Sequence, residues 1–137
     1  MWNFLIDRRI RFHNPVGLDM KANNIDEQDI RINKIISNID KKDIIALLNA
    51  WKEHLENVIV FPFEAMVLGY LNKGPLKFSD KVSVKRIDVI DDLYGVIVEL
   101  RCGRKKYYHP LSDLKIIDEK STNYQHIEDY SVWMANR

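Results

Sequence analysis

The stretch DKVSVKRIDVIDDLYGVIVELRCGRKKYYHPLSDLKIID, residues 80–118, decides the fold. Apolar and polar residues alternate within its short runs, as they do in β-strands that are buried on one face only. Tight turns at Asp91–Leu93 and at Gly103 separate these runs. Pro110 stops the third run and opens the corner PLSDL, which fits a one-turn 3₁₀ helix before a last short strand. The pattern therefore predicts a small, strongly curled antiparallel sheet.

Upstream of this stretch the periodicity is helical. Isoleucines recur at helical spacing after Asn24, and a second apolar stripe from Ile44 to Val58 predicts a helix with Asp40 as its N-cap. A strand containing Phe61, Pro62 and Phe63 follows, and aromatic residues near the end of the chain predict a closing helix.

These elements predict an α+β fold, a small SH3-like or Tudor-like five-stranded barrel packed against N-terminal helices with a short C-terminal helix. We expect residues 1–23 to form a weakly ordered N-terminal arm and residues 24–137 to form one domain. Within that domain the helices span 24–57, the barrel spans 58–118 and the C-terminal helical segment spans 119–137.

The composition is that of an ordinary soluble domain. Of 137 residues, 46% are apolar and 30% are charged, and the formal net charge is +1. The single cysteine, Cys102, permits no intrachain disulfide, which favours a reducing compartment. No apolar run approaches the ~20 residues of a membrane span, and charges interrupt the first residues where a signal peptide would be apolar. We expect a cytoplasmic protein without membrane contact.

Three blocks of sequence carry a resemblance to a known family. They are WKEHLENVIVFPFEA at residues 51–65, DDLYG at residues 91–95 and GRKKYYHPLSDLKIID at residues 103–118. Together they resemble the cyanobacterial calcium-binding protein (CcbP) family. The resemblance implies a small soluble protein that is not an enzyme and that binds Ca²⁺ through carboxylates of its globular domain.

A calcium site in this chain must be assembled from separate loops. Ca²⁺ takes six to eight oxygen ligands, and the sequence contains no EF-hand loop. In an SH3-like barrel the first long loop, the second hairpin turn and the 3₁₀ corner lie at one end. The predicted metal ligands are therefore the acids of these segments and one nearby glutamate: Asp80, Asp91, Asp92, Asp113 and Glu64. The alternative is that Asp91 and Asp113 only accept hydrogen bonds from turn amides.

Two further clusters suggest binding without a metal. Tyr94, Tyr107, Tyr108 and Trp133 could line an aromatic site, although we expect Tyr94 and Trp133 to pack in the core. Such a groove would make the chain an SH3-like interaction module for a protein partner. The basic turn over residues 101–106 is a thin footprint for nucleic acid, and we expect it to protect a sheet edge instead. We expect no enzymatic activity, because no nucleophile, phosphate-loop or paired-cysteine motif occurs.

Overall fold

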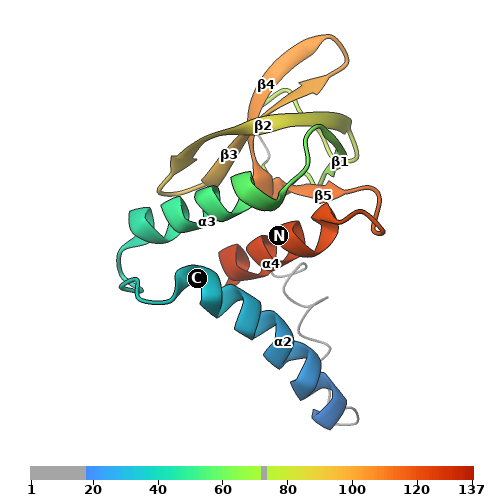
Figure 1. The fold of residues 1–137 in the computed structure, drawn as a ribbon. Coiled ribbons are helices and arrows are strands. Elements are labelled where there is room, and N and C mark those ends of the chain that lie inside the picture. Colours follow the sequence, from blue (N-terminus) through green and yellow to red (C-terminus); the bar gives the residue numbers. More distant parts are fainter. Residues whose placement is uncertain (1–17, 72–73) are drawn as a thin grey trace.

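The computed structural model describes residues 18–71 and 74–137 of the chain, with side chains from residue 27 onward. In that part of the chain, three α-helices accompany a five-stranded antiparallel sheet (Figure 1). The elements in chain order are α2 (Leu18–Ile36), α3 (Ile44–Val58), β1 (Phe63–Val67), β2 (Lys81–Asp91), β3 (Gly95–Cys102), β4 (Lys105–Pro110), the 3₁₀ helix η3 (Leu111–Asp113), β5 (Leu114–Ile116) and α4 (Asn123–Asn136).

The first two helices begin at residues other than those predicted. Helix α2 begins at Leu18, inside the predicted N-terminal arm, and residues 1–17 of that arm lie outside the described residues. Helix α3 is capped by Asp43, whose carboxylate accepts a hydrogen bond from the Ala46 amide at 3.1 Å. The prediction of Asp40 as the cap is wrong, because Asp40 instead accepts from the Lys42 amide in the preceding turn.

The strands are arranged in the order β4-β3-β2-β1-β5. The long hairpin of β2 and β3 ends in the turn after Asp91, and the pairing register of the two strands shifts between Val84 and Arg86. The α+β class is confirmed. The closed barrel is not confirmed, because β4 and β5 are the two edges of an open sheet.

The core lies between the sheet and the helices. Helix α3 packs against β2 and β3, α4 packs beside α3, and α2 packs on those two helices (Figure 1). Alternate residues of β3, Val96, Val98 and Leu100, are fully buried against the helical layer. Trp51 of α3 and Tyr130 of α4 are buried between the layers, with ring centroids 5.4 Å apart. Full burial of a Val or Leu side chain, as in β3, stabilises the fold by about 1.5–3 kcal/mol.

Tyr130 also fixes one end of β3 through its hydroxyl group. The buried Val96 amide donates a hydrogen bond to the Tyr130 hydroxyl oxygen at 2.8 Å. Burial raises the pKa of Tyr130 far above its usual value, so the phenol stays neutral. Gly95, with φ of +81°, brings the backbone close to this hydroxyl, and a β-carbon at residue 95 would collide with it.

Candidate functional site

The five predicted metal ligands are divided between the two ends of β2. Asp80 immediately precedes this strand, whereas Asp91 ends it and Asp92 follows. The strand has 11 residues, so its ends are roughly 30 Å apart at about 3.3 Å per residue, less what the bulges remove. One calcium ion therefore cannot bind Asp80 and Asp91 together.

Asp80, Asp113 and Glu64 are placed around β1. At the end of that strand, the Val67 amide donates to the Asp80 carbonyl at 2.9 Å and the Leu68 amide donates to the Asp113 carbonyl at 2.8 Å. The Asp80 carboxylate accepts from the Lys77 amide within its own turn. Glu64 is exposed on β1. The backbone thus brings Asp80 and Asp113 to one end of β1, but the Asp80 carboxylate already has a local donor.

Asp113 is a buried structural carboxylate. Its side chain is 1% exposed, and its Oδ2 lies 2.7 Å from Nε2 of His109. Its Oδ1 accepts a hydrogen bond from the Tyr70 amide at 2.8 Å. These contacts join the corner after β4 to the segment that leaves β1, so both carboxylate oxygens are used within the fold.

The turn at Asp91 and Asp92 offers accessible oxygen atoms. Asp91 Oδ1 accepts hydrogen bonds from the Leu93 and Tyr94 amides, both at 2.8 Å. The bond from Tyr94, and then that from Leu93, lowers the pKa of Asp91. Asp92 is exposed. The Arg137 guanidinium donates to the Asp92 carbonyl at 3.5 Å and to the Leu93 carbonyl at 3.1 Å, so a cationic side chain already lies at this turn.

Among the residues that the structure describes, no three His, Cys, Asp or Glu side chains are gathered closely enough to hold a metal ion. The turn at Asp91 and Asp92 nevertheless has suitable donor chemistry, since carboxylate and carbonyl oxygens are the ligands that Ca²⁺ prefers. Two carboxylates and nearby carbonyls would provide part of a coordination shell, and water would complete it.

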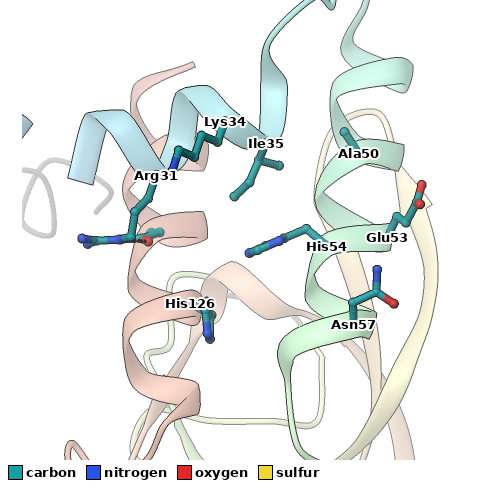
Figure 2. A pocket seen from close by; sticks show the side chains of 9 residues that line it. Arg31, Lys34, Ile35, Ala50, Glu53, His54, Asn57 and His126 are labelled. Carbon is teal, nitrogen blue, oxygen red and sulfur yellow. Dashed lines mark hydrogen bonds and ion pairs between the residues drawn. The ribbon is translucent and has the colours of Figure 1, made fainter. Parts of the chain in front are cut away.

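A second feature is a cavity of about 450 Å³ between α2, α3 and α4 (Figure 2). His54 of α3 points into it, and His126 of α4 lies beside it with the two ring centroids 5.6 Å apart. On the side of α2, Arg31 binds the buried Asp129 through two hydrogen bonds of 2.7 and 3.0 Å. Burial, and next the neighbouring His126, lowers the pKa of His54.

Sequence reasoning missed this cavity because its residues come from three separate helices. Arg31, His54 and His126 have no spacing that marks a motif. Only the packing of α2 on α3 and α4 brings them together. Lys34 and Glu53 also line the cavity, so it carries one further charge of each sign beside the pair of Arg31 and Asp129.

A third feature is a groove of about 350 Å³ over β3 and β4, which we call the tyrosine groove. Three tyrosines from the predicted aromatic cluster line it: Tyr94, Tyr107 and Tyr108. The prediction of Tyr94 as a core residue is wrong, because its side chain is 46% exposed. Trp133, by contrast, is buried in the core as expected, with its ring centroid 5.7 Å from that of Trp51.

Comparison with known proteins relates this geometry to a family. The family model of the calcium-binding CcbP proteins matches residues 28–134. The chain belongs to the CcbP family. The fold is similar to that of CcbP from Anabaena, with a TM-score of 0.64 and 24% sequence identity over 80% of this chain and 90% of that one. It is also similar to a structure described as a calcium-binding protein in the calcium-binding form, with a TM-score of 0.66 and 23% identity over the same shares.

No curated protein sequence matches this member of the CcbP family. The family is one of calcium-binding proteins and is not an enzyme family. Within the described part of the chain, no helix has the length and apolar character needed to cross a membrane.

Proposed function

We propose that this protein binds Ca²⁺ as a non-enzymatic calcium-binding protein, with the turn at Asp91 and Asp92 supplying the carboxylate ligands. Membership of the CcbP family supports the ion. The observation that carries the location is the geometry of the turn, where the Leu93 and Tyr94 amides hold one carboxylate oxygen of Asp91 and the exposed Asp92 follows directly. The second oxygen of Asp91 and the carboxylate of Asp92 remain for a cation.

The other three predicted ligands lie outside the proposed site. Asp113 is buried and binds His109, and Asp80 lies at the far end of β2. Glu64 is exposed on β1 and lies opposite Ser83, near the start of β2 and far from the β2–β3 turn. With two carboxylates the affinity should be low, with a Kd of about 0.1–1 mM, because calcium affinity rises with the number of charged ligands.

The near-absence of cysteine also fits the proposal of a cytoplasmic location. Cys102 is the only cysteine of the chain, and a reducing compartment leaves it as a thiol.

Calorimetric and NMR titrations with Ca²⁺ test this function. We expect Ca²⁺ to shift the amide signals of residues 91–95 first and to bind the Asp91→Asn, Asp92→Asn double variant at least about tenfold more weakly. Mg²⁺ should bind more weakly than Ca²⁺, because it requires near-ideal octahedral geometry and loses its water reluctantly.

Asp118 and Glu119 offer a matched control. They are another exposed acidic pair in a turn, and the Asp118 carboxylate accepts a hydrogen bond from the Lys120 amide, as Asp91 does from its own turn. The Asp118→Asn, Glu119→Gln variant should bind Ca²⁺ as the wild type does. An equal loss of calcium affinity in both double variants would show a diffuse charge effect. Unaltered binding in the Asp91→Asn, Asp92→Asn variant would place calcium elsewhere.

A further inference from the structure

Separate segments of the chain line the tyrosine groove. Tyr94 comes from the β2–β3 turn, Pro75 from the segment between β1 and β2, and Tyr108 and Pro110 from β4. Ile97 of β3 lies opposite Pro110 in the sheet and also lines the groove. Tyr108 is 53% exposed, so a broad aromatic surface faces solvent.

Walls of this kind fit one class of ligand especially well. Pro-rich segments adopt an extended polyproline helix without internal hydrogen bonds, and they dock into grooves lined by aromatic rings. Because such a segment is already stiff, it loses little conformational entropy when it binds. A shallow groove lined by tyrosine and proline can therefore hold an extended proline-containing segment.

A cluster of basic residues lies beside the groove, because Lys106 directly precedes Tyr107 in β4. The turn between β3 and β4 carries four exposed basic residues, which we call the basic hairpin: Arg101, Arg104, Lys105 and Lys106. Among the described residues none of the four forms an ion pair with a carboxylate, whereas the exposed Arg86 pairs with both Asp88 and Glu99. The basic hairpin thus offers charge complementarity to an acidic ligand.

The opposite end of the groove carries a net negative charge, from two carboxylates against the guanidinium of Arg137. Tyr94 belongs to the same turn as Asp91 and Asp92, which lies at the other end of β3 from the basic hairpin. A nucleic acid has phosphates along its whole length, and these acids would repel it. A peptide can carry acidic residues on one side of its proline core only. The two ends of β3 therefore favour a peptide over a nucleic acid.

We propose that the tyrosine groove binds an extended, proline-containing segment of a partner protein, with acidic residues placed toward the basic hairpin. This gives the expected protein-partner function a defined surface and a ligand chemistry. The surface is separate from the cavity between the helices, and it touches the proposed calcium turn only through Tyr94.

Selection from a library of short random peptides, with the full chain as bait in EDTA, tests the proposal. We expect recovered peptides to be enriched in proline, with Asp or Glu on one side of the proline core. Amide signals of Tyr94, Tyr107 and Tyr108 should shift when such a peptide is titrated. Recovery of no peptides, or of peptides without proline, would overturn the proposal, as would tighter binding of a single-stranded oligonucleotide.

Point variants distinguish specific peptide binding in the groove from non-specific binding. Tyr108→Ala should weaken peptide binding about tenfold, in line with a central aromatic contact. Phe78→Ala is the matched control, because Phe78 is also an exposed aromatic residue, at 68%, but does not line the groove. A Lys106→Glu variant should lose affinity for the acidic peptide and gain it for a peptide with Lys in place of the acids. An unchanged preference would assign the basic hairpin to edge protection alone and overturn the charge part of the proposal.

Discussion

Replacement of Asp113 by alanine should separate a structural acid from a calcium ligand. The carboxylate is buried and takes part in two contacts, a 2.8 Å hydrogen bond from the Tyr70 amide and a 2.7 Å contact with His109. Removal of an acceptor from a buried donor costs about 1–3 kcal/mol, and more for a charged group. Two such losses lower the free energy of unfolding by about 3 kcal/mol, or the Tm by about 10 °C for a domain of this size.

Urea unfolding followed by tryptophan fluorescence measures this loss, with Trp51 and Trp133 as buried reporters. Asp80→Ala is the control, because Asp80 accepts a single hydrogen bond near the surface and should cost about 1 kcal/mol or less. Asp113→Asn should cost less than Asp113→Ala, since its amide oxygen can still accept from Tyr70. The reasoning is refuted if Asp113→Ala is as stable as the wild type, or if the folded variant loses calcium affinity while Asp91→Asn does not.

Three further results are expected. Gly95→Ala should lower the free energy of unfolding by about 3 kcal/mol, because the residue has a φ of +81° and its new methyl group would collide with the Tyr130 hydroxyl; a Tm equal to that of the wild type would contradict this. Burial and His126 lower the pKa of His54 from 6.5, so the unfolded state binds more protons than the folded state, and stability should fall as the pH drops below about 6.5. Denaturant titrations at about pH 7.5 and about pH 5.5 should therefore give a smaller difference in the free energy of unfolding for His54→Gln than for the wild type. Equal differences in the two proteins would remove His54 as the cause. Arg137→Gln should raise calcium affinity about fivefold, because it removes a cation that binds two carbonyls of the β2–β3 turn. The repulsion between this cation and a bound divalent ion weakens binding by about 1 kcal/mol in water. Calorimetry that finds no gain in affinity would show that Ca²⁺ does not bind beside this guanidinium.

Alternation in the sequence predicted the strands well because each strand is buried on one face only. Val96, Val98 and Leu100 of β3 are buried as their spacing indicated, and the corner after Pro110 is the predicted 3₁₀ helix. Closure of the sheet could not be predicted in the same way. It depends on hydrogen bonds between the first and last strands of the sheet, and β5, with its three residues, is too short to carry a periodic signal.

The chemistry of the acidic residues was harder to predict than their positions. An aspartate in a turn has the same sequence signature whether it binds a metal or a backbone amide. Asp91 accepts two amides, as the alternative prediction proposed, yet this arrangement still leaves one oxygen free. Asp113 is buried in contact with His109 and with the Tyr70 amide. Tyr70 lies far from Asp113 in the sequence, so no local pattern indicates that contact.

The near-zero net charge of the chain says little about calcium binding, because the two charged ends of β3 act independently. The strand has 8 residues, so the basic hairpin lies roughly 25 Å from the turn at Asp91 and Asp92. At physiological salt the Debye length is about 8 Å, so the hairpin cations are largely screened at that turn. The local balance there consists of two carboxylates against the guanidinium of Arg137. Calcium affinity should therefore respond to Arg137 and hardly at all to Arg104, and the basic hairpin remains free to bind an acidic partner while calcium occupies the other end of the strand.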